Sequence, residues 1–180
     1  YAVTCSANTS PSISCSDLVI SGSNLTLNVN SGLTITQTST NPSISITASS
    51  GTSLGISGSI FSNDIGLVNT NVIDSLVINP SGSIYGYEYA IRNEGTINSL
   101  VNKNIISSSP DSHDAAIDNF GTIQTLTNIG TVTGFLYNIW NGDGDPPTIG
   151  RYGTINNLQG QSGPLRYSGD LPSHYNIIIY

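Results

Sequence analysis

The stretch NEGTINSLVN, residues 93–102, returns 26 residues later as NFGTIQTLTN, residues 119–128. Both fit the pattern Asn-x-Gly-Thr-Ile-x-x-Leu-x-Asn. A looser copy, LVNTNVIDSLVIN, begins at Leu67 and precedes them at nearly the same spacing. A fourth copy is interrupted, because ten additional residues separate Asn141 from the Gly-Thr-Ile-x-x-Leu segment that begins at Gly153. The chain therefore contains an internal repeat with a unit of 24 to 26 residues where it is uninterrupted.

A repeat of this length is too short to enclose a core of its own, so it must stack on its neighbours. A leucine-rich repeat would need a helical or extended outer segment, whereas here the rest of each unit is Gly, Ser, Asn and β-branched residues, which oppose helix. A parallel β-helix instead winds each unit into three short strands and three turns. We therefore expect an all-β chain folded as a parallel β-helix of about seven coils that rise by about 4.8 Å each.

Stacked coils would place like residues over like. One expected inward column contains Ile91, Ile117 and Ile139, and paired inward positions are expected at Ile97 with Leu100, Ile123 with Leu126, and Ile155 with Leu158. Corner columns are expected from Asn93, Asn119 and Asn141, and from Asn102 and Asn128. Asparagine accepts unusual backbone angles and can hydrogen-bond its counterpart in the next coil. Gly95, Gly121 and Gly153 are expected to allow the sharp turn into the next strand.

The rest of the chain is interpreted as further coils of one domain. Short alternating runs such as LVI at 18–20 and ISI at 44–46 predict strands with one buried face. An open solenoid end needs a cap, and Cys5 and Cys15 are expected to close a short disulfide loop there. The expected boundaries within 1–180 are a cap at 1–17, irregular coils at 18–66, regular repeats at 67–160 with an insertion near 142–151, and a truncated terminal coil at 161–180.

Composition narrows the functional classes. Only 8% of residues are charged and the formal net charge is -7, so a basic surface for nucleic acid or anionic membranes is not expected. No apolar run approaches the roughly 20 residues that span a bilayer as a helix. The sequence contains no methionine even at its first position, which indicates a processed or excised fragment.

The pattern Asn-x-Gly-Thr-Ile-x-x-Leu-x-Asn-x-Gly-Thr-Val at 119–132 resembles passenger domains of bacterial autotransporters, the type V secreted proteins. The ending GDLPSHYNIIIY at 169–180 is similar to the stretch that follows such repeats in that family. The resemblance covers about residues 67–180. It implies a right-handed parallel β-helix exported to the surface of a Gram-negative bacterium, with an outer-membrane barrel in the full-length protein and a role in adhesion or self-association.

Carboxylates near a histidine suggest a catalytic alternative. The loop after Ile106 contains Asp111, His113 and Asp114, and Asp118 follows in the repeat. Asp111, Asp114 and Asp118 are the candidate acids or bases of a polysaccharide-degrading hydrolase or lyase. A solvated turn is the simpler interpretation. No cofactor or metal is expected, because Asp143 and Asp145 give only half of a calcium-loop pattern.

Aromatic residues supply the candidate binding positions. Alternation in IYGYEYAI places Tyr85, Tyr87 and Tyr89 on one side of an expected strand, where their rings could stack on sugars or on another chain. The insertion and its flanks contribute a second set of candidates: Tyr137, Trp140, Asp143, Asp145, Arg151 and Tyr152. Insertions in solenoids gather on one face and often bind partners.

The sequence therefore predicts a non-catalytic adhesin passenger, at the cell surface or secreted. Its expected partner is a host-surface or glycan ligand, or another copy of itself. The polysaccharide-degrading enzyme remains the alternative.

Overall fold

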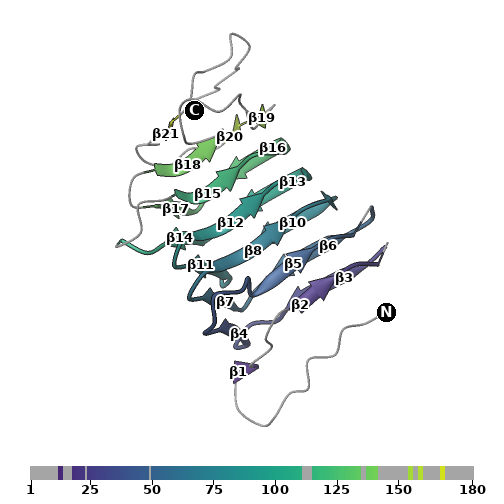
Figure 1. The fold of residues 1–180 in the computed structure, drawn as a ribbon, viewed down its shortest axis with the longest axis vertical. Coiled ribbons are helices and arrows are strands. Elements are labelled where there is room, and N and C mark those ends of the chain that lie inside the picture. The colour runs from purple at the N-terminus through teal and green to yellow at the C-terminus, as the bar shows by residue number, and fades with distance from the viewer. Residues whose placement is uncertain are drawn as a thin grey trace.

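The computed structural model describes residues 12–13, 18–22, 24–48, 50–110, 115–134 and 137–141, and the strands Thr154–Ile155, Leu158–Gln159 and Tyr167–Ser168. All regular elements in these residues are strands, and all their pairings are parallel. The strands form three sheets that the chain visits in turn (Figure 1). The predicted parallel β-helix is confirmed.

Each sheet takes its strands from successive coils, and in sheet 3 two coils contribute a pair of short strands, β9 with β10 and β19 with β20, that align with one strand of the neighbouring coil. Sheet 1 contains β1 (Ser12–Ile13), β4 (Thr34–Gln37), β7 (Ser59–Ser62), β11 (Ser83–Gly86), β14 (Ile105–Ser108) and β17 (Thr131–Thr133). Sheet 2 contains β2 (Leu18–Ile20), β5 (Ile44–Ile46), β8 (Ile65–Asn69), β12 (Tyr89–Asn93), β15 (Ala115–Asn119), β18 (Tyr137–Asn141) and β21 (Tyr167–Ser168). Sheet 3 contains β3 (Thr26–Val29), β6 (Ser53–Ile56), β9 (Val72–Ile73), β10 (Ser75–Ile78), β13 (Thr96–Asn102), β16 (Thr122–Asn128), β19 (Thr154–Ile155) and β20 (Leu158–Gln159).

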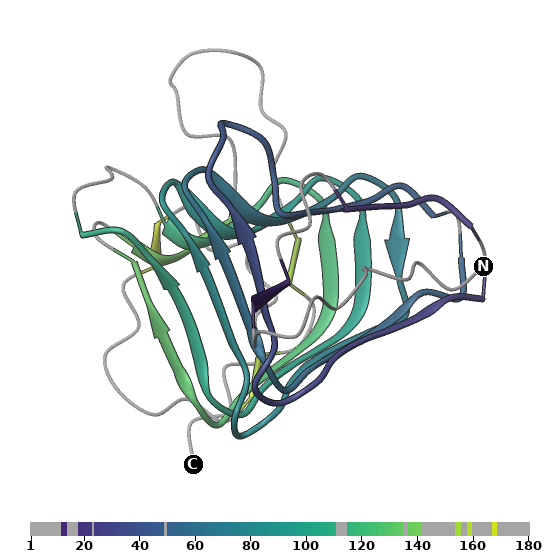
Figure 2. The same ribbon diagram turned by 90° about the horizontal axis from the view of Figure 1, so that it is seen from below.

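The coils overlay one another when viewed along the long axis (Figure 2). In sheet 2 the path from β2 to β18 passes through β5, β8, β12 and β15, which makes five turns, and β21 pairs with β18 beyond them. The expectation of about seven coils for the whole chain, like the expected Cys5–Cys15 disulfide in the cap, extends outside the described residues.

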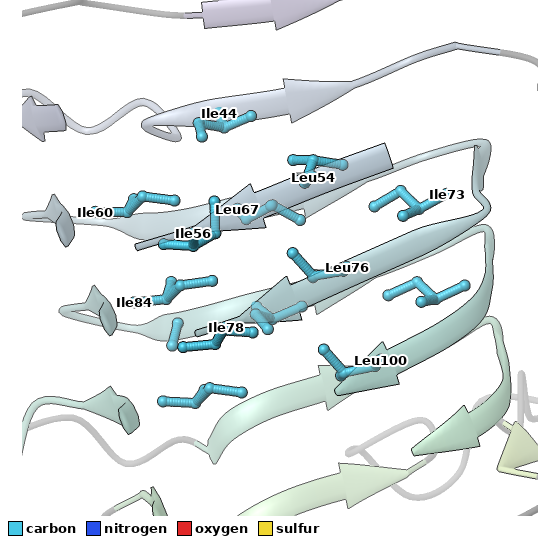
Figure 3. Close-up of a cluster of buried hydrophobic side chains, with 14 of the residues drawn as sticks. Ile44, Leu54, Ile56, Ile60, Leu67, Ile73, Leu76, Ile78, Ile84 and Leu100 are labelled. Carbon is cyan, nitrogen blue, oxygen red and sulfur yellow. The ribbon is translucent and has the colours of Figure 1, made fainter. Parts of the chain in front are cut away.

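The inward columns lie as the repeat predicts. Ile91 pairs with Ile117, which pairs with Ile139. Leu76, Leu100 and Leu126 are successive partners in sheet 3, and Ile97 lies beside Ile123. The side chains of these columns are fully buried. Figure 3 shows the stacking for Leu54, Leu76 and Leu100, so the core is a continuous dry column rather than a separate cluster in each coil.

Asparagines brace two corners of the solenoid. Asn69 donates from Nδ2 to Oδ1 of Asn93 at 2.7 Å, Asn93 donates to Asn119 at 2.7 Å, and Asn119 donates to Asn141 at 2.6 Å. At the second corner Asn102 donates to Asn128 at 2.8 Å. We call these rows the asparagine ladders. Their members are at most 5% exposed, so the bonds form in a dry interior.

The physical reason for the constant turn positions of the repeat differs from the expected one. Neither the ladder asparagines nor Gly95 and Gly121 have positive φ in the described chain. A Cβ added at Gly121 would collide with the backbone oxygen of Gly95, and a Cβ at Gly95 would collide with that of Asn71. Glycine is therefore needed at this corner because successive coils approach too closely for any side chain.

One inward corner column carries serines whose surroundings differ. Ser62 Oγ accepts a hydrogen bond from the Asp64 N–H at 3.1 Å and donates to the Asn41 carbonyl at 3.4 Å. The residue two positions after Ser108 is Pro110, which has no N–H to donate. Among the described residues, Ser108 Oγ is buried without a hydrogen-bond partner. The same residue type is thus satisfied in one coil and unsatisfied two coils later.

Candidate functional site

The outward side of sheet 2 brings together residues that are far apart in sequence. Arg92 in β12 lies between Val68 and Asp118 in the pairing of adjacent strands, and Asp118 in β15 pairs with Trp140 in β18. Their neighbours in each strand, such as Ile91 and Ile117, point into the core. Alternation along a strand therefore turns this row toward the outside.

Arg92 is the centre of this group. Its Nε donates to Glu94 Oε1 at 2.9 Å and lies 3.9 Å from Asp118 Oδ2. The guanidinium carbon lies 5.7 Å from the ring centroid of Tyr89 and 5.0 Å from that of Phe120, within the range of cation–π attraction. We call Tyr89, Arg92, Glu94, Asp118, Phe120 and Trp140 the Arg92 cluster.

The register explains why the cluster forms. Glu94 and Phe120 each occupy the variable position of Asn-x-Gly in successive copies, and their N–H groups bond the carbonyls of Asn69 and Asn93 in equivalent ways. Phe120 therefore sits one coil above Glu94, as Asp118 sits one coil above Arg92. The asparagine ladder that ends β12 and β15 fixes both strands on the inner side, so the outer group is held on a rigid base.

Among the described residues of this region, carboxyl groups outnumber cations. Arg92 is surrounded by the carboxylates of Glu94 and Asp118, and Asp118 is 1% exposed although it lies in the outward row. Burial raises the pKa of the Asp64 carboxyl above its ordinary value of 3.8, and the charge of Arg92 acts in the opposite direction. In the part of the chain that the structure describes, Arg92 is thus the one cation near Glu94, Asp118 and Asp64.

The three predicted tyrosines do not share a strand, so the expected row of rings is wrong. Tyr85 lies in β11 of sheet 1, Tyr87 lies in the bend that follows, and Tyr89 opens β12 of sheet 2. Tyr85 instead stacks on Phe61 of the preceding coil, with centroids 4.8 Å apart and ring planes 8° apart. Only Tyr89 belongs to the Arg92 cluster, and Tyr87 is 44% exposed.

The other predicted site residues fall into two groups. Asp118 and Trp140 lie in the outward row of sheet 2, and Tyr137 opens the same strand as Trp140. The remaining candidates lie outside the described residues: Cys5, Cys15, Asp111, Asp114, Asp143, Asp145, Arg151 and Tyr152. The described chain contains no group of three or more side chains suited to hold a metal ion.

Arg92, Glu94 and Phe120 were not predicted as site residues. The signal that could have identified them is variation at fixed positions of the repeat. The motif keeps Asn, Gly and Ile constant, while the positions before and after the first asparagine change from Arg and Glu to Asp and Phe. In a stacked repeat such variable outward positions become direct neighbours across coils.

Comparison of the chain with family models, with curated proteins and with solved structures found no match. In the part of the chain that the structure describes, no helix is long and apolar enough to cross a membrane.

Proposed function

We propose that the chain is a non-catalytic passenger domain of a surface-exposed or secreted adhesin, which mediates attachment or self-association. The observation that carries this proposal is the set of in-register polar rows on a rigid scaffold. On the outer side of sheet 3, Thr26, Ser53, Ser75, Ser99 and Thr125 follow one another from coil to coil.

Such rows suit many weak contacts made at once. Small hydroxyl groups repeat at about the strand spacing of 4.8 Å, and each can donate and accept a hydrogen bond. A single contact of this kind is weak, but a partner that engages several coils gains from multivalency. The asparagine ladders and the buried aliphatic columns keep the rows straight, so little conformational entropy is lost when a partner binds.

The secretion route is part of the same proposal. The resemblance of the repeat at 119–132 to autotransporter passengers supports export to a Gram-negative cell surface through an outer-membrane barrel. The parallel β-helix is consistent with such a passenger. The low charge and net charge of -7 do not favour a nucleic-acid partner.

A clumping and attachment assay tests the function. Cells that display the chain should aggregate or attach to a host-cell or glycan-coated surface more than cells from which it has been deleted. Replacing Ser75 and Ser99 together with lysine places two like charges in adjacent coils of the hydroxyl row and should reduce the effect if sheet 3 is the contact face. Unchanged clumping and attachment after deletion would refute the proposal.

The enzyme alternative has a simple discriminating test. Release of reducing ends from a panel of polysaccharides, abolished by Asp118→Asn, would favour a hydrolase and replace the adhesin proposal. Release of unsaturated products would instead indicate lyase chemistry.

A further inference from the structure

We infer that the Arg92 cluster is a binding site for a neutral, hydroxyl-rich sugar. The inference rests on the proposed function, since it names the ligand class that an attachment surface would take at this place. The cluster combines a fixed guanidinium, carboxylates and aromatic rings within three coils of sheet 2.

Arg92 retains hydrogen-bonding capacity that its contacts in the described chain do not use. Within the described chain, Arg92 donates its hydrogen bond through Nε, to Glu94. Its planar fork carries further N–H groups on the two terminal nitrogens. The side chain is 32% exposed, and that of Glu94 is 41% exposed. Donors on Arg92 and acceptors on Glu94 are therefore presented to solvent next to each other.

The neighbours of Arg92 hold its side chain in place before any ligand binds. The rings of Tyr89 and Phe120 lie 5.7 and 5.0 Å from the guanidinium carbon, and Asp118 Oδ2 lies 3.9 Å from Nε. These contacts restrict a side chain that would otherwise lose much rotamer entropy on binding a ligand. The guanidinium of Arg92 is therefore fixed with its terminal nitrogens available to a ligand. An isolated surface salt bridge would leave the side chain more mobile.

The charges and rings of the Arg92 cluster select the class of ligand. Among the described residues, the formal charges of Arg92, Glu94 and Asp118 sum to -1, and Asp64 adds a further nearby carboxyl. An anionic ligand would be repelled, and a ligand without acceptors would leave the Arg92 donors unused. Vicinal sugar hydroxyls accept from a guanidinium and donate to a carboxylate, while the C–H face of a sugar packs on aromatic rings. A neutral hexose or N-acetylhexosamine unit has hydroxyl groups for Arg92 and Glu94 and a C–H face for an aromatic ring, and it adds no negative charge.

The test is binding of the full 180-residue chain to an array of neutral hexose and N-acetylhexosamine oligosaccharides, with sialylated and uronic-acid oligosaccharides alongside. At least one neutral glycan should bind, and its affinity should change little between low and high salt because no charge is neutralised. Arg92→Gln should weaken that affinity roughly tenfold or more, as expected for the loss of charge-assisted hydrogen bonds. Lys103→Gln changes the net charge equally at another exposed position and should have no effect.

Glu94→Gln is a second variant at an exposed position, whose retained fold can be checked by circular dichroism. It removes one charged acceptor and should weaken the same glycan several-fold. Equal affinity of wild type and both cluster variants would overturn the inference, as would preferential binding of the sialylated or uronic-acid glycans. Cells that clump through this chain while it binds no neutral glycan would overturn the inference and leave the proposed function standing. If deletion of the chain leaves clumping and attachment unchanged, and the chain binds no glycan, both the proposed function and the sugar-binding inference are wrong.

Discussion

Replacing Asn93 with alanine removes the central rung of the longer asparagine ladder. Asn93 is fully buried, accepts from Asn69 at 2.7 Å, and donates to Asn119 Oδ1 at 2.7 Å. It also donates to the carbonyls of Gly95 and Thr122, at 3.2 Å each. The two Nδ2 protons are shared among three acceptors, so the side chain makes about three full hydrogen bonds in all. At about 1 kcal/mol each, and with buried partners left unsatisfied, their loss predicts a decrease of about 3–5 kcal/mol in the free energy of unfolding. That is a large share of the stability of a typical domain.

The measurement is urea unfolding followed by far-UV circular dichroism, with residue-resolved hydrogen exchange to show where the solenoid opens. Asn98 in the next strand, β13, is the matched control, because it is exposed and, among the described residues, its side chain bonds only Asp74 Oδ1, at 3.0 Å. Asn98→Ala should cost less than about 1 kcal/mol. If Asn93→Ala costs no more than Asn98→Ala, the ladder does not stabilise the fold and the reasoning is wrong.

A variant of the same shape distinguishes the contribution of the hydrogen bonds of Asn93 from that of its side-chain volume. Asn93→Asp keeps the shape but replaces the donating Nδ2 by an oxygen that faces three acceptors. Burial raises the pKa of such a carboxyl, so the variant should be least stable at neutral pH and regain stability as the pH falls through that raised pKa. Stability that is independent of pH in this variant would contradict the buried geometry.

Ile97→Ala should lower the free energy of unfolding by about 2–5 kcal/mol, because Ile97 is fully buried in an inward column. Ile129 is 61% exposed, so Ile129→Ala should change the same quantity by less than about 1 kcal/mol in a urea titration. Ser62→Ala should cost about 1 kcal/mol through its two lost hydrogen bonds, while Ser108→Ala, which removes an unsatisfied buried hydroxyl, should be neutral or stabilising in the same urea titration. The raised pKa of Asp64 means that its ionised form opposes folding, so Asp64→Asn should match or exceed wild-type thermal stability at pH 7, and the difference should vanish as the pH falls toward 3.8.

The regular coils could be predicted because chemical identity repeats where stacking demands it. The repeat aligns Asn93 with Asn119 and Leu100 with Leu126 in the amino-acid sequence alone. In the structure these residues are neighbours in adjacent coils. The upstream coils have the same register without the visible motif. There the corner position of Asn69 is occupied by Ile46, which maintains the column by apolar packing instead of hydrogen bonds.

The tyrosine prediction failed for a local reason. The corner between sheets 1 and 2 takes only two residues in this coil, Tyr87 and Glu88. Period-two alternation therefore continues through the bend, and the sequence cannot distinguish one strand from two strands joined by so short a corner. The contact between Arg92 and Phe120 was not predicted for a different reason. These residues are 28 positions apart in the sequence, and the register between adjacent coils brings them together.

The stacking of like residues in successive coils is the claim on which the fold, the ladders and the Arg92 cluster all depend. Nuclear Overhauser spectroscopy on a sample with labelled leucine and isoleucine methyl groups measures it directly. Leu100 should give strong cross-peaks to both Leu76 and Leu126, and Leu76 should give none to Leu126, since two coils separate them by about 10 Å. Absence of the Leu100 cross-peaks, or contacts from Leu100 to non-equivalent positions in their place, would contradict the account.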